Sequence, residues 1–239
     1  MDDKILDGKA LSKRLREELK LEIEKTYENT ERHIKLAIIQ VGDNPASNVY
    51  VRNKTKACEE VGIICEDYKL SENLSTWQVM HAIVDLNSDP TVDGILVQLP
   101  LPEHIDQEKV LQTICPEKDV DCFNYCNFGK ICIKSRAYDL IPCTPLGIIT
   151  LLEENNIDTD GKECVIVGRS NIVGRPLANI LSNQMHNATV TIAHSHTKNL
   201  KEICKRADIL ISAIGKAKYI DDEYIKEGAV VIDVGMNRD

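Results

Sequence analysis

The chain has 239 residues, of which 43% are hydrophobic and 28% charged, and its formal net charge is −9 at pH 7. This balance predicts a globular protein of one large or two modest domains. The negative charge argues against a nucleic-acid partner, because phosphate binding needs a basic face. No apolar run approaches the roughly 20 residues that span a membrane, and the acidic N-terminus lacks a leader's apolar stretch. We therefore expect a cytoplasmic protein with no nucleic-acid or membrane partner.

The first half of the chain alternates between helical and strand-like patterns. Leucine and isoleucine recur every four residues over 7–25, which predicts an amphipathic helix. Ser47 is expected to cap a second helix, and Gly62 to end it. A third helix is expected near 75–87, and strands are expected at 35–41, 63–69 and 94–99. Strands that alternate with helices indicate an α/β domain.

Residues 115–141 have weak periodicity and resist assignment. Thr144 and Pro145 suggest an N-cap followed by proline at the first helical position, with the helix running to about residue 154. Alternation then restarts, with strands expected at 163–167, 188–193, 208–214 and 229–234 and helices at 173–183, 198–206 and 221–227. We predict two α/β domains with a cleft between them: a substrate domain at 1–143 and a Rossmann-type, doubly wound parallel sheet at 144–239.

Nine cysteines are many for this length. Their odd number and the absence of an export signal argue against a disulfide framework and favour a reducing cytosol. The densest group is Cys115, Cys122, Cys126 and Cys132, whose spacings match no paired C-x2-C zinc pattern. We expect buried or half-exposed thiols and no metal.

A glycine-rich turn, GRSNIVG from Gly168 to Gly174, joins a predicted strand to a predicted helix. Such a turn lets backbone N–H groups approach a phosphate at the helix N-terminus. The spacing departs from G-x-G-x-x-G, so an ordinary turn of an α/β sheet is the alternative. Arg169 and Ser170 lie in the turn and could meet a phosphate.

The end of the next strand bears on the cofactor. Enzymes specific for NAD usually carry a carboxylate there for the ribose 2′-OH, whereas this chain reads AHSHT at 193–197. A hydroxyl and imidazoles beside Arg169 suit a 2′-phosphate, because guanidinium pairs well with phosphate oxygens. We therefore expect NADP. Solvated loop histidines remain the alternative for His194 and His196.

Tyr50 and Lys54 lie four residues apart, on one face of a predicted helix. The spacing is similar to the catalytic pair of short-chain dehydrogenases, but there the glycine turn precedes the pair within one domain. A surface lysine is the alternative for Lys54, and Lys56 is expected to be solvated.

Polar residues at two further places, within the predicted strand at 94–99 and in the weakly periodic region, could contact a ligand. Gln98 interrupts an apolar strand near its C-terminal end, outside which ligands of open α/β sheets bind. A satisfied structural glutamine is the alternative. Asp119 and Asp121 could form a solvated turn, or a carboxylate there could recognise paired N–H donors of a heterocycle.

Taken together, these segments resemble the methylenetetrahydrofolate dehydrogenase/cyclohydrolase family in chain order. The segments are Ser47-x-x-Tyr50-x-x-x-Lys54, VDGILVQLPLP at 92–102, PEKDVD at 116–121, IPCTP at 141–145, GRSNIVGRP at 168–176 and VIDVG at 231–235. The resemblance implies oxidation of 5,10-methylenetetrahydrofolate by NADP and hydrolysis of the methenyl product to 10-formyltetrahydrofolate. It also implies a homodimer and a place in one-carbon metabolism and purine biosynthesis.

The resemblance assigns roles by position. Lys54 would be the catalytic residue with Tyr50 beside it, and Gln98 would be its hydrogen-bond partner. Asp121 would hold the pterin ring. The flanking folate contacts would be Val97 and Leu99, and the cofactor would be lined by Gly168, Arg169, Ser170, Ser195 and Met236.

The chain departs from the family pattern at two places. Cys122 stands where the family usually has glycine, so a Cβ would strain the turn wherever φ is positive. The family also continues beyond the segment that ends here, with residues that contribute to both ligand sites. A catalytically impaired protein that binds NADP or folate is therefore the alternative function, and a shortened form with no separate biology is a third reading.

Overall fold

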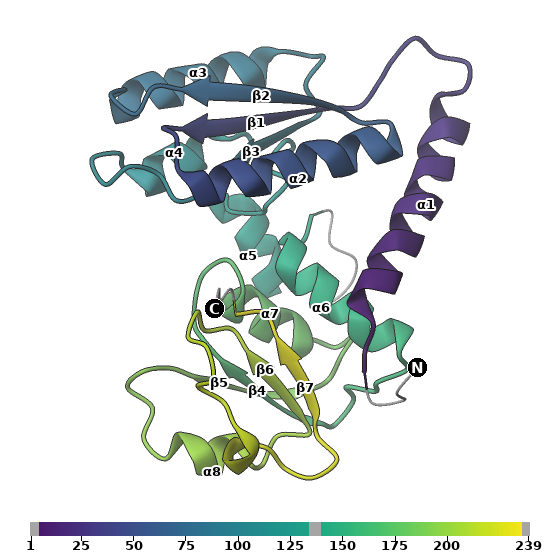
Figure 1. The fold of residues 1–239 in the computed structure, drawn as a ribbon, viewed down its shortest axis with the longest axis vertical. Coiled ribbons are helices and arrows are strands. Elements are labelled where there is room, and N and C mark those ends of the chain that lie inside the picture. The colour runs from purple at the N-terminus through teal and green to yellow at the C-terminus, as the bar shows by residue number, and fades with distance from the viewer. Residues whose placement is uncertain (1–4, 134–139, 236–239) are drawn as a thin grey trace. The chain divides into compact units, whose positions relative to one another are not determined.

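A computed structural model describes residues 5–133 and 140–235. The chain forms two compact units, Met1–Tyr125 and Cys126–Asp239. Each contains its own parallel sheet, of three and four strands respectively (Figure 1). This confirms an α/β protein of two domains. The sequence placed the division after residue 143. In the structure the second unit begins earlier, at Cys126 within α5 (Tyr125–Ile133).

The sheet of the first unit has the order β2-β1-β3. Its strands are β1 (Lys35–Val41), β2 (Ile64–Leu70) and β3 (Gly94–Val97), all parallel and close to the expected ranges. On one face, Val51 of α2 (Pro45–Val61) packs with Ile38 and Leu96. On the other face, α3 (Thr76–Ser88) and α4 (Gln107–Thr113) cover Ala37 and Ile39. Helices on both faces explain why β3 is apolar throughout and why β1 is apolar except at Lys35 and Gln40.

The predicted N-cap of α2 was wrong, and the predicted C-terminal end of this helix was correct. Asn44 is the N-cap, because its Oδ1 accepts hydrogen bonds from the N–H groups of Ala46 and Ser47 at 2.9 and 3.2 Å. Ser47 was expected there but lies buried inside the helix, since Pro45 starts the helix two residues earlier. Gly62 ends α2 as expected, with a left-handed φ of 87°.

Two further helices complete the first unit and its border. The amphipathic pattern at 7–25 forms α1 (Gly8–Tyr27), whose N-terminus is capped by Asp7. Arg16 of α1 forms an ion pair with Glu60 of α2 at 3.0 Å. The sequence did not predict α4, a short helix capped by Asp106, nor α5, which lies inside the weakly periodic region.

The second unit has the strand order β5-β4-β6-β7, all parallel. Its strands are β4 (Glu163–Val167), β5 (Thr189–Ala193), β6 (Ile209–Ser212) and β7 (Val230–Asp233). From β4 the chain first adds β5 on one side and then β6 on the other. The carboxyl ends of β4 and β6 therefore border a topological switch point, where open α/β sheets bind ligands.

The helices of the second unit differ more from expectation. They are α6 (Cys143–Glu154), α7 (Gly174–Leu181) and α8 (Leu200–Cys204). Thr144 is not an N-cap, because α6 begins at Cys143 after Pro142 with no side-chain cap. The helix expected at 221–227 is only a 3₁₀ turn, η1 (Asp222–Tyr224), after which Ile225 is extended. Tyr224 and Ile225 pack on the core around Val165 and Leu210, and this tertiary packing overrides helix propensity.

In the part of the chain that the structure describes, no helix combines the length and apolar character needed to traverse a lipid bilayer.

Candidate functional site

The first site feature joins α2 to the end of β3. The Lys54 ammonium Nζ donates a hydrogen bond to Gln98 Oε1 at 3.3 Å, across 44 residues of sequence. Both side chains are half-buried. The link exists because α2 covers the sheet face next to β3, whose last residue, Val97, precedes Gln98. The two residues that the sequence singled out separately therefore form one polar pair.

The Gln98 amide is held in a single orientation. Its Nε2 donates to the Leu99 carbonyl at 2.8 Å, which leaves Oε1 to face Lys54. The Gln98 backbone N–H donates to the Ile39 carbonyl at 2.8 Å, so the residue continues the pairing of β3 with β1. A glutamine fixed at both backbone and side chain can orient an amine with little loss of entropy.

The other predicted folate contacts fall into two groups. Tyr50 lies one turn before Lys54 on α2 and is half-buried, as is Leu99. Val97 is only 2% exposed and packs in the core beneath α3 and α4. Its side chain therefore supports the strand, and the surface near Gln98 is provided by Leu99.

The segment that carries Asp121 runs beside β3. Asp119 forms a parallel bridge with Ile95, and the Ile95 N–H donates to the Lys118 carbonyl at 2.7 Å. Gly94 permits this approach, because a Cβ there would lie 2.5 Å from Val120 Cγ1. Asp121, which is half-buried, thus lies in a turn anchored to the same strand that ends in Gln98.

This turn is held by Lys118, which sequence reasoning overlooked, and by Asp119, which it considered only as part of a solvated turn or as a ligand contact. Lys118 Nζ donates to the carbonyls of Leu86, Asn87 and Asp89 at 3.0, 2.9 and 2.6 Å, at the C-terminal end of α3. The fully buried Asp119 accepts a hydrogen bond from the Asn124 N–H at 2.8 Å. The only signal for Lys118 in the sequence was its place in PEKDVD. Both residues act as supports beside Asp121.

Cys122 occupies the strained position that its replacement of glycine suggested. Its φ is +62° and its side chain is 1% exposed. Left-handed backbone costs a residue with a Cβ roughly 1 kcal/mol or more. The turn after Asp121 therefore forms in spite of the Cβ, with the thiol packed inside the first unit.

In the second unit, the glycine turn is closely packed against the backbone around it. Gly168 has a φ of +138°, and a Cβ there would lie 2.5 Å from the Ala213 carbonyl oxygen at the end of β6. A Cβ on Gly174 would lie 2.1 Å from the Gly168 carbonyl oxygen. The turn thus crosses the switch point between β4 and β6, where only glycine fits at two positions.

The polar groups of this turn are presented to solvent. Arg169 and Ser170 are exposed, and Ser170 Oγ accepts a hydrogen bond from the Val173 N–H at 3.2 Å. Ser195 is exposed after β5, between His194 and His196. Desolvation and the nearby charges of Arg169 and His196 lower the pKa of His194. The charge of Arg169 acts on His194, which indicates that the turn after β4 lies near the turn after β5.

The remaining expectations concern Met236 and the cysteines. Met236 lies outside the described residues. Within 5–133 and 140–235, no three histidine, cysteine or carboxylate side chains are grouped to hold a metal ion. The thiols range from buried to exposed: Cys126, Cys132 and Cys143 are exposed, which differs from the expectation of buried or half-exposed thiols. Burial raises the pKa of the Cys164 thiol to about 12, so that thiol is chemically inert.

Comparison with known proteins decides the family. Residues 6–121 match the catalytic domain of tetrahydrofolate dehydrogenase/cyclohydrolase, and residues 142–239 match the NAD(P)-binding domain of the same enzyme. The chain is 53% identical over 238 residues to the bifunctional protein FolD of Acetivibrio thermocellus, and the match covers 100% of this chain and 82% of that protein. The chain belongs to the tetrahydrofolate dehydrogenase/cyclohydrolase family.

Solved structures of the family agree with this assignment. The bifunctional FolD dehydrogenase/cyclohydrolase of Campylobacter jejuni has a TM-score of 0.93 at 46% identity, covering 98% of this chain and 81% of that one. The FolD of Trypanosoma brucei, solved with NADP cofactor and an inhibitor, has a TM-score of 0.91 at 36% identity over 97% of this chain and 78% of that one.

Proposed function

We propose that this chain oxidises 5,10-methylenetetrahydrofolate to the 5,10-methenyl form with NADP and hydrolyses that product to 10-formyltetrahydrofolate. Family membership supports the reaction class. The observation that carries the residue assignment is the hydrogen bond from Lys54 Nζ to Gln98 Oε1. A lysine held by a fixed amide at the carboxyl end of a parallel strand has the form of a reacting group rather than of a solvated surface lysine.

The first unit would bind the folate. Lys54 is the catalytic residue of this proposal, Tyr50 lies beside it on α2, and Gln98 orients the amine. Asp121 would accept hydrogen bonds from the paired N–H donors of the pterin ring, since a carboxylate offers two acceptor oxygens in one plane. The neighbouring surface would come from Leu99, with the buried Val97 supporting the strand beneath it.

The second unit would bind NADP. The close-packed glycines support the fit, because a Cβ on Gly168 or Gly174 would collide with a backbone carbonyl oxygen and displace the turn whose N–H groups would face a phosphate. Ser170 and Ser195 would contribute hydroxyl groups, and Met236 would line the nicotinamide end. We assign the 2′-phosphate to Arg169, whose charge acts on His194, because the end of β5 at 193–197 carries no carboxylate for a ribose 2′-OH.

The chemistry divides between the cofactor and the protein. NADP supplies the hydride acceptor for the first reaction. That step requires mainly that the reacting carbons be positioned, because the folate nitrogen lone pairs can expel the hydride. The hydrolysis requires proton transfer around an attacking water. The Lys54 amine would take and return that proton, and Gln98 would hold the amine close to the reacting carbon.

A coupled assay tests the proposal. The chain is mixed with methylenetetrahydrofolate and either NADP or NAD, and the methenyl absorbance is followed together with its decay. Turnover that is faster with NADP supports the bifunctional enzyme. Binding of both ligands without turnover would instead support the impaired binding protein.

The assembly is a separate part of the proposal. We expect a homodimer, as the family resemblance implies. Sedimentation equilibrium across a range of protein concentrations would give the mass of one chain, 26.8 kDa, or twice that value. A single-chain mass at all concentrations would contradict the dimer.

A further inference from the structure

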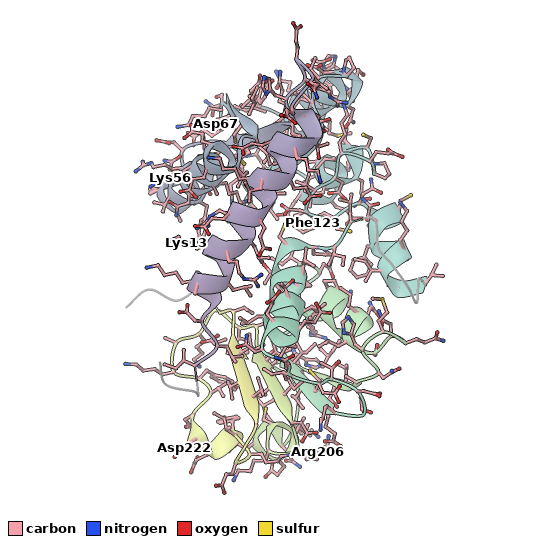
Figure 2. All side chains as sticks on the ribbon, turned by 90° about the vertical axis from the view of Figure 1, so that its right-hand side faces the viewer. Lys13, Lys56, Asp67, Phe123, Arg206 and Asp222 are labelled. Carbon is pink, nitrogen blue, oxygen red and sulfur yellow. The ribbon has the colours of Figure 1, made fainter. Side chains whose placement is uncertain are left out.

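A hollow lies on the other side of α2 from the Lys54–Gln98 pair. It has a volume of about 610 Å³ and lies between α2 and the edge strand β2, with Gln40 of β1 among its lining residues. Lys54 and Gln98 do not line it. Lys56 of α2 and Asp67 of β2, both lining residues, lie on the same flank of the first unit (Figure 2). Its volume falls in the range of small-molecule sites, roughly 300–1,000 Å³.

A buried acceptor in this hollow needs a donor. Gln40 is 1% exposed, and its Nε2 donates to Asn48 Oδ1 at 2.7 Å and to the Gly42 carbonyl at 3.3 Å. Asn48 Nδ2 in turn donates to Asp43 Oδ1 at 2.9 Å, so a reversed Gln40 amide would face two acceptors. Among the described residues, no group donates to Gln40 Oε1. Because a buried carbonyl oxygen without a donor is costly, Gln40 Oε1 would gain from an O–H or N–H group of a ligand in the adjoining hollow.

The rim of the hollow carries charges that are free for a ligand. Arg52 and Lys56 lie four residues apart on α2, where like charges repel. Lys69 pairs in register with Gln40 across β1 and β2, which adds a third cation. Glu59 and Asp67 also line the hollow. In the part of the chain that the structure describes, none of these five side chains forms an ion pair or hydrogen bond, whereas α1 and α2 are joined by one between Arg16 and Glu60.

We propose that this hollow binds a small sugar phosphate or another hydroxylated phosphomonoester. Three cations outnumber two carboxylates, so the rim attracts an anion although the whole chain carries −9. The phosphate oxygens pair with Arg52, Lys56 and Lys69, because guanidinium and ammonium groups make strong charge-assisted bonds to phosphate. Hydroxyl groups donate to Gln40 Oε1 and to the carboxylates of Glu59 and Asp67. This site is independent of the folate and NADP assignments.

Isothermal titration calorimetry with glucose 6-phosphate tests this site. Glucose supplies the hydroxyl groups without the phosphate, and sulfate supplies the anion without a donor. We expect glucose 6-phosphate to bind at least tenfold more tightly than either, since each lacks one half of the contacts. The absence of heat with glucose 6-phosphate, or equal affinity for sulfate, would overturn the proposal.

Variants locate the site. Arg52→Gln and Lys69→Gln should each weaken glucose 6-phosphate binding about tenfold, and the exposed Lys25→Gln on α1 should leave it unchanged. Gln40→Met should weaken glucose 6-phosphate but not sulfate. The melting temperature shows whether Gln40→Met folds. If it does not fold, Arg52→Gln and Lys69→Gln still test whether the ligand binds in this hollow. Binding that depends on Arg169 instead of Arg52 and Lys69 would place the ligand in the second unit and sink the proposal.

Discussion

The Lys54 amine and the Gln98 amide carbonyl, 3.3 Å apart, join the middle of α2 to the end of β3. Two residues that are distant in sequence thus form one polar pair at the carboxyl end of β3.

Replacing Lys54 removes the proposed proton carrier. Lys54→Met should lower the rate of methenyltetrahydrofolate hydrolysis by about 10²- to 10⁴-fold, the usual range for general acid–base catalysis, and leave NADP binding intact. The loss of methenyl absorbance measures the hydrolysis, and fluorescence titration measures NADP. Lys25→Met, which changes an exposed lysine of α1, is the control. A Lys54→Met protein that hydrolyses at the rate of the unmodified chain would refute the role.

A carboxylate in place of Gln98 changes the charge beside Lys54 but preserves the side-chain shape. Gln98→Glu should hold the amine in its charged form, because an opposite charge within hydrogen-bond reach favours ionisation. The pH at which hydrolysis reaches half its maximal rate should then rise by about one to two units. Gln98→Met, which removes the acceptor without adding charge, should lower the rate without that shift. An unchanged pH profile for Gln98→Glu would separate Gln98 from Lys54 in function.

Arg169 is assigned to the 2′-phosphate that distinguishes NADP from NAD. Arg169→Gln should raise the KM for NADP roughly 10- to 100-fold, since a charge-assisted hydrogen bond is worth about 1.5–3 kcal/mol, and should leave the KM for NAD nearly unchanged. Arg206→Gln is the control, because Arg206 is exposed and pairs only loosely with Glu163, at 3.9 Å. An equal rise in the KM for NADP and the KM for NAD in Arg169→Gln would show that Arg169 does not bind the 2′-phosphate.

Two glycines with opposite surroundings test the close packing of the cofactor turn. Gly174→Ala would place a Cβ 2.1 Å from a carbonyl oxygen, so we expect a loss of about 3 kcal/mol in the free energy of unfolding and weaker NADP binding. Gly147→Ala lies in α6 with nothing within 4 Å and should gain about 0.5–1 kcal/mol. Urea unfolding of both variants measures the difference. A neutral Gly174→Ala would show that the turn is looser than its geometry indicates.

His186 predicts a dependence of stability on pH. Desolvation lowers the pKa of its imidazole from the usual 6.5, against a smaller opposing effect of Glu153. Below pH 6.5 the unfolded chain therefore binds the proton first, and stability falls as the pH drops, by at most about 1.4 kcal/mol per pH unit. Urea midpoints between pH 7 and pH 5 should show this decline, and His186→Gln should reduce it. An identical slope in His186→Gln would assign the effect to other groups.

The strands were predictable because burial on both faces produces apolar runs. β1 and β4 lie where the sequence alone puts them, at 35–41 and 163–167. Helix ends were less predictable, since neighbouring residues compete to cap them, as Asn44 does with Ser47. The 3₁₀ turn η1 could not be predicted from local sequence. Tyr224 and Ile225 pack against the core, and no local pattern records that packing.

The site was only partly predictable for a related reason. Lys54, Gln98 and Asp121 could each be selected by residue type and strand position, but their supports could not. The bond between Lys54 and Gln98 spans 44 residues, and Lys118 reaches carbonyls about 30 residues away. Gln40 carried the same signal as Gln98, a polar residue within an apolar strand, and the sequence analysis passed over it.

Lys118 gives three carbonyls of one helix end a single shared donor, and its neighbour Val120 fills the space above Gly94. Tolerance to mutation should therefore be low along 86–89 as well, although that stretch has no assigned ligand. A screen for altered pterin selectivity should therefore include residues 86–89, because displacing this helix end should shift the turn that holds Asp121, the residue proposed to bind the pterin.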